Sequence, residues 1–198
     1  MVELAWQIMM GVGLAASAGL RAFLPLFVVG VAGRLELVPL SAPFAWMSTT
    51  PALIVFGVAV CIEVVGDKFP LVDHFLDTAG TLVRPVAGAL VAAAPITSLD
   101  PLTGLVVGVI LGGAAAGGVH AAKATLRVVS STGTGGLANP LISASEDAAS
   151  LSGSVVSLFL PVVTFTLAVA VLCLFVFYLL AHRRSGAGDA DLARGAGR

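Results

Sequence analysis

The chain alternates between long hydrophobic runs and short polar stretches, and the first run is the longest. It extends from Leu4 to Gly33 and would measure about 45 Å as one helix, against a hydrocarbon core of about 30 Å. Arg21 places a full charge in its middle, and Pro25 removes a backbone donor. We therefore expect a helix that is broken or kinked near Arg21. The alternative is one long, tilted helix whose Arg21 side chain reaches an interface.

Later hydrophobic runs predict further membrane helices, each bounded by proline, glycine or charged residues. They cover about Pro51–Gly66, Leu71–Ala94, Leu102–Val129 and Val155–Ala181, the last with a kink at Pro161. A loop is expected over Leu35–Ser48.

The segment Leu137–Ser154 is too polar to face lipid directly. Four of its polar residues lie three or four apart and form one stripe on a helix: Ser143, Glu146, Asp147 and Ser150. Because lipid offers these groups no partner, we expect the segment to be helical and largely shielded from lipid.

Counting Leu137–Ser154 as a crossing gives about six membrane segments, with both termini on one side. Most basic residues then share that side: Lys68, Arg84, Lys123, Arg127, Arg183 and Arg184. Without this crossing, the basic residues near the last helix would face away from those on the glycine-rich helix. Because lysine and arginine gather on the cytoplasmic side, we expect a cell-membrane protein with six segments and cytoplasmic termini.

Composition supports a helical membrane protein. The 198 residues are 58% hydrophobic and 11% charged, and their mean hydropathy is +1.06, whereas a soluble domain carries about 25% charged residues. The net charge of −1 gives no reason to expect a nucleic-acid partner. We expect one all-α, polytopic transmembrane bundle over residues 1–182, with at least one broken or re-entrant segment. Residues 183–198 are expected to form a disordered polar tail.

Charged residues crowd into one stretch between two hydrophobic runs, Glu63–Pro85. Carboxylates four residues apart share a helix face, where they can hold a cation or share a proton, and this spacing occurs twice here. The candidates for an ion pathway are Glu63, Asp67, Lys68, Asp73, His74, Asp77 and Arg84. The alternative is a hydrated turn whose ions pair with one another and orient two helices.

Three charges lie within segments that offer them no nearby partner of opposite sign: Arg21, Glu146 and Asp147. An unpaired charge at that depth is costly, whereas an ion pair can persist. We therefore predict that Arg21 lies against Glu146 or Asp147, directly or through one water. The two segments would then face each other around a central cavity lined by Asn139. The Glu63–Arg84 charges would form its cytoplasmic mouth.

Glycines in Leu102–Val129 recur every four residues at Gly104, Gly108 and Gly112. Small residues at this spacing let helix backbones approach closely in lipid. We expect the stripe to pack against another helix, and a homo-oligomer formed through it is an option.

Isolated histidines and cysteines give no sign of a metal site or disulfide. His74 and His120 each lack a second ligand nearby, so an interhelical hydrogen bond is the expected role. Cys61 and Cys173 lie in hydrophobic runs and are expected to be buried small side chains.

Motifs for a nucleophile, a phosphate-binding loop or a cysteine–histidine metal site do not occur in the chain. We expect neither catalytic residues nor a cofactor, and the pattern does not decide whether a metal binds. An intramembrane acid–base site needs no long motif, so an enzyme remains an alternative.

Four motifs carry a family resemblance: GLRAFLPLFVVG (Gly19–Gly30), EVVGDKFPLVDHFLD (Glu63–Asp77), LVRPVAGAL (Leu82–Leu90) and GGLANPLISASED (Gly135–Asp147). They resemble a bacterial integral-membrane family, the domain of unknown function 4126 family, over about residues 10–180. The resemblance implies a small multi-helix membrane domain and supplies no activity, substrate or cofactor.

A shorter motif, EVVGDK, resembles the Glu-x-Gly-Asp-Lys signature of small cation exchangers, in which the acids bind the metal. The matching residues are Glu63, Asp67 and Lys68. One extra residue before Gly66 changes the helical phase by about 100° relative to that signature.

These observations favour a transporter or channel for a cation or proton in the lipid bilayer. The alternative is binding or translocation of an anionic lipid or lipid-linked phosphate by Arg21, Lys68 and Arg84. A scaffold subunit that docks through the glycine stripe is a third option.

Overall fold

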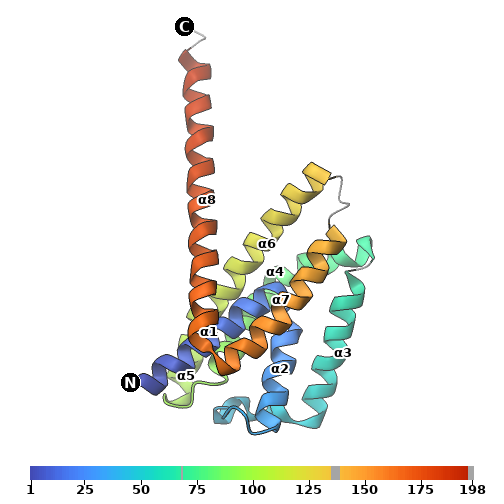
Figure 1. Cartoon of the computed structure of the whole chain (residues 1–198), viewed down its shortest axis with the longest axis vertical. Coiled ribbons are helices and arrows are strands. Elements are labelled where there is room, and N and C mark those ends of the chain that lie inside the picture. Colours follow the sequence, from blue (N-terminus) through green and yellow to red (C-terminus); the bar gives the residue numbers. More distant parts are fainter. Residues whose placement is uncertain (68, 135–138, 196–198) are drawn as a thin grey trace.

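The computed structural model describes the backbone of residues 1–67, 69–134 and 139–195. Side chains are described for these residues except 70, 71, 73, 74, 131, 134, 139, 140 and 182–195. The described chain forms a bundle of helices without a β-strand (Figure 1). The expected all-α class is therefore confirmed.

The first hydrophobic run is broken at Arg21, as predicted. Helix α1 (Val2–Leu20) ends where Arg21 takes an extended backbone, with φ −135° and ψ 117°, and α2 (Phe23–Arg34) follows. Pro25 lies in the first turn of α2, where its missing N–H leaves no helical hydrogen bond unmade. The single tilted helix is thereby excluded.

The chain also reverses direction at this break. The Gln7 side chain of α1 accepts hydrogen bonds from Thr97 N (3.2 Å) and Ser98 N (3.1 Å), beyond the end of α4 (Pro70–Ala93). Ser41 N, in the loop after α2, donates to Ala94 O at 2.9 Å. The start of α1 and the loop after α2 therefore lie at one end of the bundle.

This reversal changes the expected topology. The prediction of two termini on one side counted the first run as one crossing, whereas α1 and α2 run in opposite directions (Figure 1). The N-terminus and the end of α8 (Pro161–Gly195) consequently lie at opposite ends of the molecule in Figure 1.

The next two helices meet the sequence expectations closely. Within the expected loop, a short 3₁₀ helix, η1 (Ala42–Ser48), buries Phe44 and Met47. It leads into α3 (Thr50–Gly66), which begins after a Thr49 cap, and then into α4. The predicted helix bounds are confirmed within a few residues.

The glycine-rich span is one helical path with a π-helical turn. It comprises α5 (Pro101–Val107), the turn η2 (Gly108–Gly112) and α6 (Gly113–Thr134). Asp100 caps its start by accepting a hydrogen bond from Thr103 N at 3.1 Å. The Thr103 hydrogen bond holds the pKa of Asp100 below its usual value.

Pro161 separates two helices and does not kink one. Helix α7 (Asn139–Phe159) ends just before it, and α8 begins at Pro161, where a proline at the first helical position costs little. Helix α8 then continues to Gly195, where the sequence predicted a disordered tail from residue 183. A helix already formed in the membrane segment extends at one hydrogen bond per added residue.

Among the described residues, four helical stretches are long and apolar enough to cross a membrane: Val2–Leu20, Phe75–Ala93, Pro101–Ser130 and Pro161–Ala181. A fifth crossing results if η1 and α3, which meet at 66°, form one span. Helix α7 is too polar to be among them, so the sixth crossing stays a prediction.

Helix α1 occupies the centre of the bundle because glycines line it on several sides. A Cβ atom at Gly11 would lie 2.5 Å from Ala92 O of α4, and one at Gly19 would lie 2.5 Å from Ala116 O of α6. On a third side, a Cβ at Gly13 would meet Ser157 Oγ of α7 at 2.6 Å. Helices approach closely in lipid through such small residues.

The stripe Gly104–Gly108–Gly112 packs inside the chain, as expected. All three glycines are buried, and Gly108 and Gly112 lie directly against Ala93 and Ala92 of α4. The stripe is therefore used within one chain, and we do not propose it as a surface between copies.

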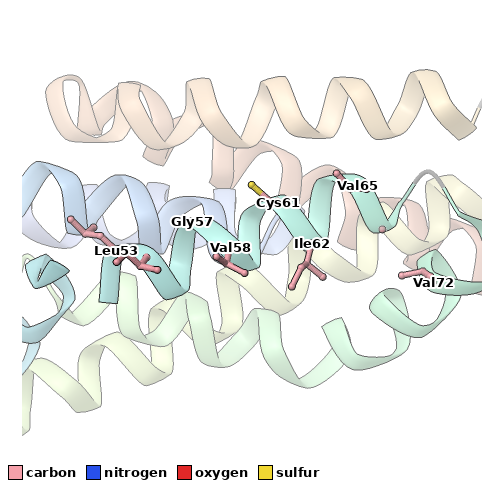
Figure 2. Close-up of a pocket in the computed structure, with 9 residues that line it drawn as sticks. Leu53, Gly57, Val58, Cys61, Ile62, Val65 and Val72 are labelled. Carbon is pink, nitrogen blue, oxygen red and sulfur yellow. The ribbon is translucent and has the colours of Figure 1, made fainter. Parts of the chain in front are cut away.

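Both cysteines lie on the outside of the bundle, contrary to the expectation of burial. Cys61 borders an open, apolar groove of about 700 Å³ along α3, together with Ile62 and Val65 (Figure 2). These side chains face outward because the outer surface of a membrane helix is itself hydrophobic. Neither cysteine forms a disulfide.

Two adjacent glycines in the glycine-rich span give a matched test of its packing against α4. Gly112→Ala places a methyl group against Gly88 O and Ala92, so we expect a loss of about 1–3 kcal/mol in unfolding free energy. Gly113→Ala meets only Pro85 O, at 3.7 Å, and should leave stability equal or higher. Unfolding in detergent measures both, and equal effects would contradict the close α4 contact.

Candidate functional site

The broken first helix leaves backbone groups inside the bundle that need partners. The carboxylate of Glu63, on α3, accepts hydrogen bonds from Ala22 N (2.9 Å) and Phe23 N (3.3 Å). These N–H groups belong to the start of α2, the positive end of its helix dipole. Glu63 is buried, and it stabilises the new helix start.

At the end of α1 the backbone groups that need partners are carbonyls, and side chains of other helices donate hydrogen bonds to them. Lys123 Nζ, from α6, donates to Leu20 O at 3.3 Å, and Ser150 Oγ, from α7, donates to Ser17 O at 3.0 Å. A cation is favourable here because free carbonyl groups make a helix C-terminus negative. Both ends of the break are therefore held by side chains from other helices.

Arg21 lies at the break and is entirely buried. Its guanidinium pairs with Asp67, which directly follows α3, and its Nε lies 2.6 Å from Asp147 Oδ1 of α7. It also donates to Ser143 Oγ at 3.0 Å and to Glu63 O at 3.4 Å. The predicted pairing of Arg21 with Glu146 or Asp147 is confirmed at Asp147, whereas the Asp67 contact was not expected.

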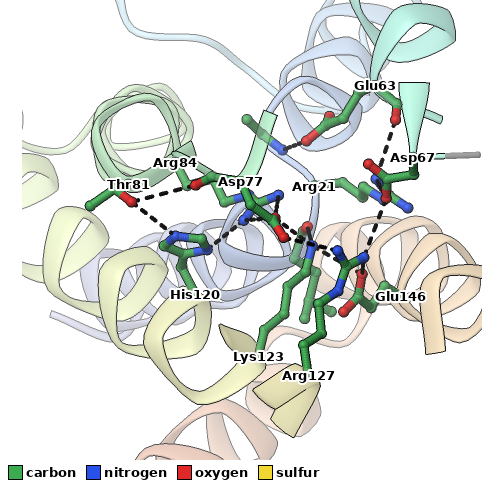
Figure 3. Close-up of polar contacts among 12 residues, drawn as sticks. Arg21, Glu63, Asp67, Asp77, Thr81, Arg84, His120, Lys123, Arg127 and Glu146 are labelled. Atoms are coloured by element: carbon green, nitrogen blue, oxygen red, sulfur yellow. Dashed lines mark hydrogen bonds and ion pairs between the residues drawn. The ribbon is translucent and has the colours of Figure 1, made fainter. Parts of the chain in front are cut away.

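A second group of charges joins α4, α6 and α7. Arg127 contacts Asp77 Oδ2 at 2.9 Å and Glu146 Oε2 at 3.0 Å, and Lys123 Nζ lies 2.9 Å from the same Glu146 oxygen. Arg127 also lies 3.4 Å from Asp67, which links this group to Arg21 (Figure 3). The ion pairs therefore form one continuous network.

Arg84 and His120 extend the network along α4 and α6. Arg84 contacts Asp77 Oδ1 at 3.3 Å and lies against His120 Nδ1. Because a guanidinium only donates, Nδ1 accepts, and the ring proton sits on Nε2, 3.5 Å from Thr81 Oγ1. The expected interhelical hydrogen bond of His120 is confirmed.

No group of three or more histidine, cysteine, aspartate or glutamate residues suited to a metal ion occurs among the described residues. Glu63 and Asp67, matched above to a cation-exchanger signature, contact helix α2 and Arg21 instead.

The described network contains one more carboxylate than cations. Its acids are Glu63, Asp67, Asp77, Glu146 and Asp147, and its cations are Arg21, Arg84, Lys123 and Arg127. Most of these side chains are nearly inaccessible, but Asp77 remains 32% exposed and Asp147 23% exposed. These two acids are the partly exposed members of an otherwise buried network.

Most of the candidate residues from the sequence meet in this network. Lys68 lies outside the described residues, as do the side chains of Asp73, His74 and Asn139. Sequence analysis missed Lys123 and Arg127 as site residues. Their spacing of four residues, with His120 three before Lys123, places all three on one helix face and was the available signal.

Around Arg21, the space between the broken helix and α7 is filled, whereas the sequence analysis expected a central cavity there. Ion pairs and Ser143 occupy it and bury Arg21 completely. The polar stripe of α7 does face inward, but its other face is exposed, with Leu141 at 76% and Leu151 at 50%. Shielding from the outside is therefore confined to the polar face.

Variants of Glu63 test whether it stabilises the start of α2. Glu63→Ala leaves two buried N–H groups without an acceptor, at about 1–3 kcal/mol each, whereas Glu63→Gln keeps one carbonyl acceptor and should lose less. Glu36→Gln, at an exposed acid, is the control. Unfolding free energies in detergent should rank Ala below Gln below control, and indistinguishable values would refute the capping role.

Comparison with known proteins gives one match. A family model described as Domain of unknown function (DUF4126) matches residues 8–181, most of the chain and all of the site described above. No curated protein and no solved structure matches the chain. The chain therefore belongs to the DUF4126 family and is a helical, multi-pass membrane protein.

Proposed function

We propose that this protein is a small transporter or channel that passes protons or a cation through its ion-pair network. The observation that carries the proposal is a buried network of ion pairs at a helix break, between membrane-spanning helices. Ionisable residues are expensive in a membrane interior and are characteristic of ion and substrate pathways. Broken helices surround the binding sites of many transporters.

The charge balance of the network favours a positively charged substrate. Among the described side chains, five carboxylates face four cations, so one added proton or monovalent cation would neutralise the network. Neutralisation is favourable because a net buried charge is poorly solvated.

The two partly exposed acids support the access of a proton or cation to the network. Asp77 contacts Arg84, Lys123 and Arg127, whereas Asp147 contacts Arg21. A proton or cation arriving at either acid would weaken its hold on these partners. The released guanidinium or ammonium group would then pair with the next carboxylate. The positive charge of the ion would thus pass along the network as the ion pairs exchange partners.

Anionic-lipid binding by Arg21 and Arg84 has less support. Both guanidinium groups are buried and directed at carboxylates of the chain. A phosphate would have to displace those acids and repel them. We therefore favour the cationic substrate.

Orientation follows from charge. Helices α6 and α8 run toward the same end of the bundle (Figure 1); α6 carries Lys123 and Arg127, and α8 carries Arg183 and Arg184. We propose that this end faces the cytoplasm in the cell membrane. The reversal at Arg21 then directs the N-terminus to the opposite side.

Flux through proteoliposomes tests the function. With an internal pH dye, and with sodium or potassium gradients in parallel, the protein should conduct above empty vesicles. Asp77→Asn and Asp147→Asn should each lower the flux by about tenfold, as for a barrier raised by about 1.4 kcal/mol.

Asp100→Asn is the matched control, because Asp100 is an exposed cap outside the network and asparagine also caps helices. Its flux should remain at the wild-type level. Flux that is absent for all three ions, or unchanged in both network variants, would overturn the proposal.

A further inference from the structure

Two adjoining hollows form a groove on the outside of the bundle. They measure about 270 and 260 Å³. Both are bordered by Leu20, Val119, Ala149 and Val171, which belong to α1, α6, α7 and α8. The groove is thus continuous, and it is bordered by α8 together with α6 and α7, from which α8 diverges (Figure 1).

The groove is polar at one end and apolar at the other. Lys123, Ser145 and Glu146 border its first half, at the level of the ion-pair network. Leu167 and Ala168 of α8 border its second half. This arrangement fits an amphiphile whose polar head meets the network and whose chain follows α8.

One acceptor at the polar end has no hydrogen-bond donor. Lys123 Nζ is directed at other groups: it lies 2.9 Å from Glu146 Oε2, 3.3 Å from Leu20 O and 3.8 Å from Asp77 Oδ1. Glu146 Oε1 is buried and accepts no hydrogen bond from the described residues. A buried carboxylate oxygen without a donor is costly, so a donor supplied by a ligand would bind favourably.

We propose that the groove binds a bilayer lipid with a primary ammonium head group. An N–H of the head donates to Glu146 Oε1, and one acyl chain lies along Val119, Ala168 and Val171. The ammonium fits better than a hydroxyl or a phosphate because the described network lacks one positive charge. This lipid site does not depend on the transport function, since it requires only the groove and the free oxygen.

Native mass spectrometry with matched lipids tests the head-group preference. Phosphatidylethanolamine, phosphatidylcholine and phosphatidylglycerol with identical acyl chains are each added to delipidated protein. The trimethylated head of phosphatidylcholine carries a positive charge but no N–H donor. We expect phosphatidylethanolamine to bind about tenfold more tightly than the other two, as for one hydrogen bond to a charged group. Equal retention of phosphatidylethanolamine and phosphatidylcholine would overturn the proposal.

Neighbouring alanines of α7 test the groove without disturbing the network. Ala149 borders the groove and is exposed, so Ala149→Phe should fill it and abolish the preferential binding of phosphatidylethanolamine. Ala148→Phe adds the same ring at the next exposed position and should leave binding unchanged. Equal lipid retention in the two variants would place the lipid elsewhere.

A third variant addresses the acceptor itself. Glu146→Gln removes the negative charge, so the preference for phosphatidylethanolamine over phosphatidylcholine should disappear. A preference that persists in folded Glu146→Gln protein would assign the donor to another group and overturn the proposed contact. Vesicle flux is measured on the same samples, so failure of lipid binding is distinguished from failure of transport.

Discussion

A helix that ends inside a bundle of apolar helices leaves N–H and C=O groups that neither lipid nor neighbouring hydrocarbon can satisfy. The break at Arg21 creates this problem twice, at the end of α1 and at the start of α2. Glu63 satisfies one end, and Lys123 with Ser150 satisfies the other. These side chains bring charge into the interior, and their charge in turn requires further partners.

The remaining polar architecture follows from that requirement. Arg21 forms ion pairs with Asp67 and Asp147, and Lys123 forms one with Glu146. Helix α7 carries acids and serines on one face because that face meets the break, while its other face remains apolar. Glycines along α1 bring the neighbouring helices close enough for the contacts to form. A network assembled this way holds the helix break together, and the proposed ion passage rests on its excess carboxylate and its two partly exposed acids.

Sequence reasoning located the break because a charge and a proline within one hydrophobic run conflict with a single helix. It also paired Arg21 with an acid of α7, since neither had a local partner and few alternatives existed. The hydrophobic pattern does not indicate the direction of a helix, however, so the reversal between α1 and α2, on which the expected placement of the termini depends, could not be foreseen. Glu63 as a helix cap depends on tertiary contacts across some forty residues. Lys123 and Arg127 resembled an ordinary basic helix end, which concealed their role inside the network.

The central claim is that Arg21 and the acids around it act as one buried unit that holds the break. A double-mutant cycle between Arg21→Met and Asp67→Ala, measured by unfolding in detergent, tests this most directly. Removing either partner alone leaves a buried charge and should cost about 3–5 kcal/mol. The double variant should cost clearly less than both single variants together, with an interaction energy of about 1–3 kcal/mol. Additivity within about 0.5 kcal/mol, the behaviour of independent sites, would contradict the account.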